Sequence, residues 1–492
     1  MREYYRNMSK RFSSDKFDIV IALLICSFIA FFYWLSSRQF SQLLCDGYDQ
    51  GTYRQILWTT LHGKLFWCSF TASHGLCDLG VHMDLILGLL LPFYWLFPFP
   101  LTLLTIQIVF LALGAIPLYL LAKEKINARA GLLFAVFYLT NNFVVQSIIE
   151  GFQARTFSMP LYLFAFYSLY KKRYLLLKLF LLLLCISHEV NSLLVFMLGV
   201  YMALFREEKK MGALTAAAGL AWFILCIKVF QPYFGVHEPL GALYFMVEGK
   251  AVGDPLKIIL YCFSHPLEIM QRAFSYPKLN YFIRLFAPLG FLSLFGPKEL
   301  LIALPVFLQN FILSEHLIKI EIPRYTMALI PFIFISAIYS AVYFFKKLKS
   351  RWEALEAILI ASWVISTYAF VWNPNYNPRF LRMLSPAPAG VKNHAEAMKR
   401  IAGLIPPDAS VCADIKAFPF LANRFMLYDM PLHISESDYA LVDVKDPVLS
   451  PKPTMPREKY LEIMNGALVS PEFETVAGED GIILLKRRNI QK

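Results

Sequence analysis

Long apolar runs, separated by short polar or basic stretches, make up most of the first 372 residues of the chain. A run of roughly 20 such residues can cross the hydrocarbon core of a bilayer as a helix. The first run, residues 17–36, follows a basic amino-terminal segment. It predicts an uncleaved signal anchor, because a removable signal peptide has a shorter apolar core. Together with the later runs it predicts about eleven spans, the others being 101–122, 130–148, 157–170, 174–186, 190–205, 212–230, 281–295, 300–313, 326–345 and 354–372.

The positions of the basic residues predict how these spans are oriented. Lysine and arginine are enriched in the cytoplasmic loops of membrane proteins. With a cytoplasmic amino terminus, the strong basic clusters all fall in cytoplasmic loops, at 123–129, 171–173, 206–211 and 346–353. Counting 84–97 as a full span would move the cluster at 171–173 outside. We therefore interpret 84–97 as a helix that lies in or dips into the outer interface, broken at Pro92.

This threading leaves three parts of the chain on the outer side of a cell membrane. Two are outer loops, at about 37–100 and 231–280. The third begins with 373–390, a linker rich in proline and asparagine, and continues as 391–492, which has the pattern of a globular domain. We thus predict a mainly α fold, with a polytopic helical membrane domain over 1–372 and a small extracytoplasmic α/β domain at the carboxyl terminus.

Within the carboxy-terminal segment, runs of β-branched and aromatic residues alternate with helical patterns. The segment contains no glycine-rich phosphate loop, so we expect an accessory domain that folds independently of the membrane part. Strands are predicted at 410–415, 425–429, 439–444 and 481–487, and helices at 393–404 and 456–468.

The composition supports a membrane protein and excludes most other classes. Of the 492 residues, 58% are hydrophobic and 17% are charged, whereas soluble domains carry about a quarter charged residues. The net charge of +12 lies in loops between apolar runs, so we expect no nucleic-acid partner. Three cysteines, Cys45, Cys68 and Cys77, share the first outer loop, where an oxidising environment would allow two of them to pair.

The first outer loop carries more ionisable side chains than solubility requires. Asp49 follows the first span closely, and apolar residues then recur at helical spacing up to Gly63. This pattern predicts an amphipathic helix lying on the membrane. Solvation or helix capping would explain most of the polar groups, but a carboxylate held in a partly dry cleft could act as an acid or base. The other acids and histidines of the loop are Asp46, Asp78, Asp84, His62, His74 and His82.

Several segments resemble an uncharacterised multi-pass family, domain of unknown function 2079. They are YDQGTYRQILWTTLHGK at 48–64, the run at 81–122, CISHEVNSLLVFMLGVYMAL at 185–204, and the tail from 404 to 487. The resemblance covers about 37–487. The family is itself similar to the GT-C class of membrane glycosyltransferases. In that class an acid early in the first outer loop is the usual catalytic base, and the sugar donor is usually a polyprenyl phosphate or diphosphate.

The resemblance assigns candidate site residues position by position. The first-loop acid of the family falls on Asp49, and its loop histidine falls on His82. Its polar turn after the fifth span falls on His188 and Glu189. The catalytic role is thus assigned to Asp49, and the other three residues are assigned to substrate binding. Ionisable groups at a membrane edge are costly and usually functional, although a hydrated turn is the alternative for His188 and Glu189.

Two further positions differ in how well they match the family. The late outer motif reads IPRYTM here, with Arg324 and Tyr325 as substrate-binding candidates. After the third span the family usually carries a histidine and a glutamate, whereas this chain has Gln153 and Arg155. That departure puts a second acid or a metal at this point in doubt. Arg155, Arg324 and Lys319 either bind a lipid phosphate or only extend their charged ends towards the interface.

These features predict a membrane glycosyltransferase that moves a sugar from a polyprenyl-phosphate donor to an unidentified acceptor, with Asp49 as general base. Membrane lipids and the lipid-linked donor are its expected partners, and a divalent cation could assist the leaving phosphate. The alternatives are a transporter or flippase of a lipid-linked or small substrate, and a non-catalytic membrane protein. Transporters tend to hold polar groups near the bilayer midplane within internal repeats, and no repeat between the two halves is recognisable in this sequence.

Overall fold

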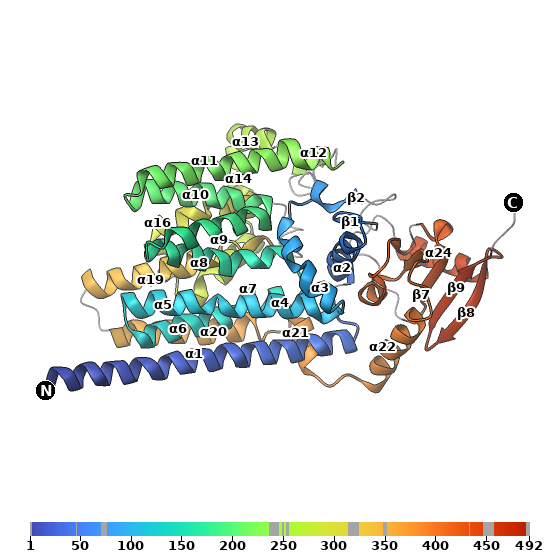
Figure 1. The fold of residues 1–492 in the computed structure, drawn as a ribbon, viewed down its shortest axis with the longest axis horizontal. Coiled ribbons are helices and arrows are strands. Elements are labelled where there is room, and N and C mark those ends of the chain that lie inside the picture. Colours follow the sequence, from blue (N-terminus) through green and yellow to red (C-terminus); the bar gives the residue numbers. More distant parts are fainter. Residues whose placement is uncertain are drawn as a thin grey trace.

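The computed structural model describes residues 2–45, 47–69, 76–235, 246–247, 250–251, 255–312, 324–347, 352–431, 433–445 and 457–488. It contains a bundle of roughly aligned helices at one end and a small mixed sheet at the other (Figure 1). The amino terminus lies at the end of the bundle farthest from the sheet. Helix α2 (Gly47–Leu61) lies between the two parts, and the chain passes from one to the other over residues 371–389.

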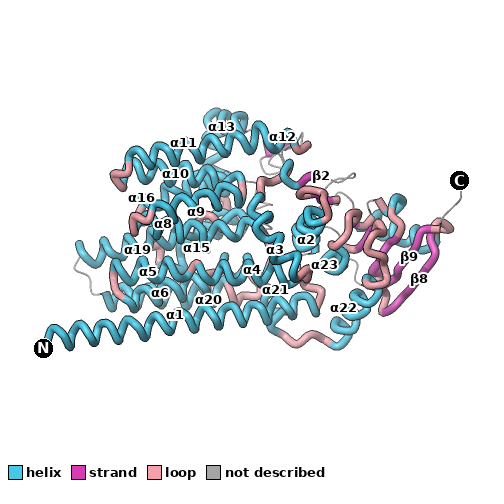
Figure 2. Tube along the Cα trace, in the orientation of Figure 1, coloured by secondary structure: helices cyan, strands magenta, loops and turns pink. Residues whose placement is uncertain are grey.

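Helices form nearly all of the membrane part (Figure 2). The long first helix lies along the outside of the bundle and packs on α4 and α6, whereas α19 is buried in the bundle against α5 and α8. The bounds are α1 (Arg2–Ser41), α3 (Leu91–Leu96), α4 (Pro100–Leu113), α5 (Ala115–Lys125), α6 (Ala128–Leu139), α7 (Asn142–Ile149), α8 (Ser158–Tyr170), α9 (Tyr174–Ser187), α10 (Glu189–Phe205), α11 (Lys209–Leu225), α12 (Gln231–Tyr233), α13 (Pro255–Ser264), α14 (Pro266–Ala273), α15 (Tyr276–Phe286), α16 (Pro297–Leu300), α17 (Leu304–Ile312), α19 (Ile330–Lys347), α20 (Trp352–Phe370) and α21 (Pro378–Leu384).

Several of these helices are long and apolar enough to cross a membrane, which confirms the multi-pass prediction in outline. Within the described residues they are Lys16–Ser41, Pro100–Lys125, Ala128–Ile149, Lys209–Tyr233 and Trp352–Phe370. Shorter apolar helices are Leu85–Leu96, Tyr174–Ser187, Glu189–Phe205 and Ile330–Phe344. The count of eleven spans stays a prediction.

Several of the predicted spans are not continuous helices, among them 281–295 and 300–313. Over 281–295 the chain leaves α15 and turns at Gly290, whose φ of 57° lies in the left-handed region that glycine adopts without strain. Over 300–313 it passes through one turn of 3-10 helix before α17 begins at Leu304. Apolar composition alone predicted long helices here, but the proline and glycine residues between 287 and 297 break the helical hydrogen bonding.

Helices α10 and α11 pack unusually closely because small residues face one another. A methyl group on Gly199 would lie 2.3 Å from the backbone nitrogen of Ala216, and one on Gly212 would lie 2.6 Å from that of Ala203. Small residues at such crossings let helix backbones approach within a membrane, where the hydrophobic effect does not drive helices together. The pair therefore forms a tight hairpin at one side of the bundle.

The prediction that the helix after Asp49 lies on the membrane surface is wrong. Helix α2 forms as expected and is followed by Gly63 with a φ of 89°. However, Asp49, Gln50, Arg54 and Gln55 on this helix are all buried, as are Ile56 and Leu57. The recurring apolar residues of α2 pack against the helical bundle and the carboxy-terminal domain, and they do not form a face that contacts lipid.

The carboxy-terminal segment folds around a five-stranded mixed sheet in the order β6-β5-β7-β9-β8. β6, β5 and β7 are parallel, whereas β9 runs antiparallel to both β7 and β8. The four predicted strands correspond to β5 (Val411–Ala413), β6 (Leu427–Asp429), β7 (Tyr439–Asp443) and β9 (Ile482–Arg487), and the predicted helices to α22 (Ala389–Ala402) and α24 (Arg457–Val469). The edge strand β8 (Phe473–Glu479) was not predicted, because most of its residues are exposed and they do not form an apolar run.

Helix α2 packs closely against the carboxy-terminal domain. A methyl group on Gly47 would collide with the carbonyl oxygen of Ile415, so only glycine allows this approach. Gln55 Nε2 donates to the carbonyl oxygens of Arg424 and Phe425, and Ser69 Oγ accepts from the Leu427 amide at 2.8 Å. The domain thus shares a polar, buried contact with the first loop, and its independent folding stays a prediction.

Candidate active site

Asp49 lies in the first turn of α2, where the positive end of the helix dipole favours a carboxylate. Arg324, far along the chain, reaches the same carboxylate, with its Nη2 2.5 Å from Asp49 Oδ2 and its Nη1 3.4 Å from Oδ1. Gln153 Nε2 donates to Oδ2 at 3.1 Å. Both oxygens of Asp49 therefore meet donors from distant segments, and the side chain is 12% exposed.

Arg155 connects the surroundings of Asp49 to the histidines. Its guanidinium lies 5.2 Å from the ring centre of Tyr325, the residue after Arg324. Its Nη2 lies 3.1 Å from His82 Nε2, and His82 Nδ1 lies 3.3 Å from Glu189 Oε1. These contacts place the His82 ring between a donor, Arg155, and an acceptor, Glu189.

The turn between α9 and α10 supplies the other half of the network. His188 caps α10, with its Nδ1 accepting from the Val190 amide at 3.2 Å and its Nε2 3.4 Å from Glu189 Oε1. Glu189 Oε2 also accepts from the Met83 amide at 3.0 Å. Burial, followed by the nearby charge of Arg155, lowers the pKa of His188 well below its usual range, so its ring is neutral.

Two carboxylates of the first loop, Asp78 and Asp84, are buried beside this network. Burial raises the pKa of each to about 7, and the negative charge of Glu189 acts in the same direction. Asp84 Oδ2 lies 3.5 Å from the hydroxyl of Tyr53, and Oδ1 has no hydrogen-bond partner within the described part of the chain. These two groups can exchange protons near neutral pH.

The structure brings all seven sequence-predicted site residues into one series of contacts. It runs from Arg324 and Asp49, through Tyr325 and Arg155, to His82, Glu189 and His188. Sequence reasoning noted Asp78 and Asp84 only as loop acids, and treated Gln153 as a departure from the family pattern. Lys319 lies outside the described residues.

One group of side chains has the donor types that a transition metal prefers. Ligand atoms of His82, His188 and Glu189 lie within 4.8 Å of one another, a set of two imidazoles and a carboxylate. In this arrangement, however, His82 Nε2 faces Arg155 and His188 Nδ1 accepts a backbone amide. The facing atoms are His82 Nδ1 and His188 Nε2, which lie 3.3 Å and 3.4 Å from Glu189 Oε1, and His188 Nε2 has no hydrogen-bond partner among the described residues. The chemistry of this donor set therefore fits a cation as well as a hydrogen-bond network.

The buried acids predict how stability depends on pH. Their pKa in the unfolded chain is the ordinary 3.8, and in the folded protein it is about 7. Between these values the folded state binds more protons at these two acids, so their contribution to the free energy of unfolding should fall as pH rises from about 4 to about 7. We expect Asp84→Asn to reduce this fall, because asparagine stays neutral. The difference in unfolding temperature between pH 5 and pH 8, measured in detergent, reports this fall.

Glu462→Gln provides the control, because Glu462 is exposed on α24 and far along the chain from the loop. It should leave the difference between the two pH values unchanged. An equal difference in the native protein and Asp84→Asn would show that Asp84 ionises normally in the folded state.

The arrangement of helices defines this protein as a polytopic membrane protein with an ArnT-like fold. The crystal structure of ArnT from Cupriavidus metallidurans bound to undecaprenyl phosphate covers 95% of this chain and 98% of its own, with a TM-score of 0.52 and 13% identity. The Archaeoglobus fulgidus oligosaccharyltransferase in complex with Zn and sulfate covers 80% of this chain and 64% of its own, with a TM-score of 0.38 and 10% identity. A comparison with curated proteins found no match.

The amino-acid sequence identifies the particular family. Residues 39–484 match the profile of a family of predicted membrane proteins, DUF2079, and the chain belongs to that family. The resemblance on which the site assignments rest is thereby confirmed, together with the likeness to the fold of GT-C membrane glycosyltransferases.

Proposed function

We propose that this protein is a membrane glycosyltransferase that transfers a sugar from a polyprenyl-phosphate donor to a hydroxyl-bearing acceptor. The observation that carries the proposal is the contact of the Asp49 carboxylate with Arg324, beside a second arginine, Arg155. A general base and groups that bind a leaving phosphate are the two requirements of this reaction. The neighbour ArnT was crystallised with undecaprenyl phosphate, which supports a polyprenyl-linked substrate here by analogy.

In the proposed reaction, Asp49 accepts the proton of the acceptor hydroxyl. The freed oxygen forms a bond to the anomeric carbon of the sugar. The bond between that carbon and the phosphate oxygen breaks, and polyprenyl phosphate leaves with the electron pair. Arg155 and Arg324 meet the developing negative charge, since a guanidinium can donate two parallel hydrogen bonds to phosphate.

The ion pair between Asp49 and Arg324 suggests how the base is released. While both donors of Arg324 face the carboxylate, Asp49 is poorly placed to receive a proton. A donor phosphate competes for the same guanidinium. Binding of the donor would then turn Arg324 away from Asp49 and leave the carboxylate available to the acceptor.

Positive charge for the leaving phosphate is already supplied by side chains. A divalent cation would be held by His82 through Nδ1, by His188 and by Glu189, and Arg155 would keep its contact with His82 Nε2. We therefore assign phosphate binding to the arginines and assign His82, Glu189 and His188 to holding Arg155 in position.

A transporter is the runner-up, and the position of the site argues against it. Helix α2, which carries Asp49, and α12, which contacts the segment before His82, lie at the end of the bundle that faces the carboxy-terminal domain (Figure 1). Transporters instead bind substrate near the bilayer midplane between repeats. The deciding experiment incubates the purified protein with a panel of polyprenyl-phosphate sugars and measures release of polyprenyl phosphate.

We also propose that the amino terminus is cytoplasmic and that the carboxy-terminal domain is extracytoplasmic, because the basic clusters then lie inside. Ser435 is exposed in that domain. A Ser435→Cys variant should therefore react with a membrane-impermeant thiol reagent in intact cells. The native protein gives the background from its own cysteines. Labelling that appears only after permeabilisation would place the domain in the cytoplasm and overturn the odd number of spans.

A further inference from the structure

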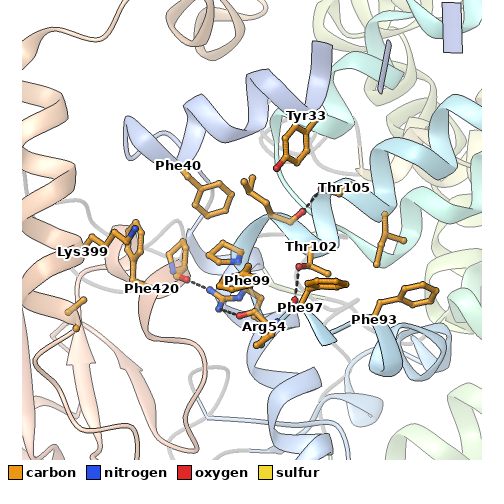
Figure 3. A pocket seen from close by; sticks show the side chains of 17 residues that line it. Tyr33, Phe40, Arg54, Phe93, Phe97, Phe99, Thr102, Thr105, Lys399 and Phe420 are labelled. Atoms are coloured by element: carbon orange, nitrogen blue, oxygen red, sulfur yellow. Dashed lines mark hydrogen bonds between the residues drawn. The ribbon is translucent and has the colours of Figure 1, made fainter. Parts of the chain in front are cut away.

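A large apolar groove lies on the side of α2 facing away from the candidate active site. It has a volume of about 850 Å³, within the range of small-ligand sites. Its walls come from α1, from the segment 93–106 and from the carboxy-terminal domain (Figure 3). Phe93, Phe97 and Phe99 in this wall are more than half exposed, as expected for aromatic side chains that contact lipid at a membrane interface.

Two cations, and no acid, line this groove within the described residues. They are Arg54 from α2 and Lys399 from the last turn of α22. The Arg54 guanidinium is buried, and among the described residues it donates only to neutral oxygens, those of Tyr94, Asn423, Pro98 and Pro419. Such partners satisfy its hydrogen bonds but not its charge, which is costly in a buried position.

Lys399 is exposed, and its ammonium group has no ion pair within the part of the chain that the structure describes. In Figure 3, Lys399 and Phe420 stand at the carboxy-terminal domain, with Arg54 between them and Phe93. One side of the groove is therefore positively charged and the rest is aromatic or aliphatic. This is the charge and polarity distribution that an anionic amphiphile requires.

We propose that this groove binds an anionic membrane phospholipid, with its headgroup towards Arg54 and Lys399 and an acyl chain along Tyr33, Phe40 and Ile106. The groove is distinct from the candidate active site, because its lining includes none of the seven residues of that network. Asp49 and Arg54 are five positions apart on α2, so at 100° per residue they project in directions about 140° apart. The inference does not depend on the glycosyltransferase proposal.

The bound lipid would fasten the carboxy-terminal domain to the membrane part. Lys399 and Phe420 belong to that domain, whereas Tyr33 and Thr105 belong to spans of the bundle. A lipid between them contacts both at once and neutralises a charge at their junction. Its binding should therefore raise the unfolding temperature as well as being measurable directly.

The test uses the delipidated full-length protein in a neutral detergent. We measure binding of phosphatidylglycerol and of phosphatidylcholine with the same acyl chains, by native mass spectrometry and by the shift in unfolding temperature. Phosphatidylglycerol should bind more tightly. Lys399→Glu should weaken its binding about fivefold or more, since each basic residue near an anionic lipid contributes a factor of about five and the substitution also reverses the charge. Lys392→Glu, at another exposed position of α22, is the matched control and should change nothing.

Three further measurements test whether phosphatidylglycerol binds in this groove. Thr105→Trp fills part of the apolar groove with a larger side chain, so it should also weaken phosphatidylglycerol binding. Inorganic phosphate alone should give no shift, because the acyl chain supplies part of the binding. Arg324→Ala should leave binding intact. Equal binding of the two lipids, equal effects of Lys399→Glu and Lys392→Glu, or loss of binding in Arg324→Ala would each overturn the proposal.

Discussion

Replacing Asp49 by asparagine is expected to lower the rate of sugar transfer by about 100- to 10,000-fold, the usual contribution of a general base. Asparagine keeps the size of the side chain and one acceptor oxygen, so the contact with Gln153 can persist. It cannot take up a proton from the acceptor. Release of polyprenyl phosphate measures the rate, and size-exclusion chromatography of the purified protein verifies that the variant folds.

Two further substitutions serve as controls for this experiment. Asp46→Asn makes the same change three residues earlier and should leave the rate close to that of the native protein. Asp84→Asn tests the competing carboxylate, whose pKa of about 7 also suits an acid or base. Full activity in Asp49→Asn with loss in Asp84→Asn would transfer the catalytic role to Asp84. Full activity in both would favour the transporter.

Arg324→Ala is expected to lower kcat/KM for the donor by about 100-fold. Removing one charged donor from a developing anion typically costs a factor of this size. If donor binding also releases Asp49, most of the fall should lie in KM, since the alanine variant binds phosphate weakly but leaves the base unmasked. Initial rates at varied donor concentration separate the two parameters.

The neighbouring substitutions again provide controls. Arg324→Lys keeps the charge but cannot make a two-point contact, so its rate should lie between those of the native protein and the alanine variant. Arg382→Ala removes an exposed arginine of α21 and should have no effect. An Arg324→Ala variant that is faster than the native protein at saturating donor would show that the ion pair only inhibits Asp49.

Much of the candidate site can be predicted from the amino-acid sequence, because ordered polar signatures between apolar runs identify the family. Asp49, His82 and Arg324 are assigned in this way, although they are separated by long stretches of chain. Their mutual contacts cannot be derived from the sequence, since no local pattern specifies which outer segments meet. The position of Gln153 illustrates this limit: a mismatch in sequence becomes a hydrogen-bond donor to Asp49 in the fold.

Burial explains what sequence reasoning missed. Asp78 and Asp84 appear in the sequence as two of several loop acids, and only enclosure beside Glu189 raises their pKa. The same reason accounts for the error over α2. A helix that packs between two domains and a helix that lies on a bilayer both show recurring apolar residues, and the partner that covers the polar face is distant in sequence.

By itself the sequence determined that the chain is a multi-pass membrane protein with a small α/β domain at its end, because apolar run length, basic residues and strand patterns are local properties. It also determined the family, and through it the residues of the candidate site. Only the tertiary structure decided that α2 is buried, that Arg324 pairs with Asp49, and that Arg54 and Lys399 border one apolar groove. These features depend on contacts between segments far apart along the chain, and burial, charge compensation and cavity shape follow from such contacts alone.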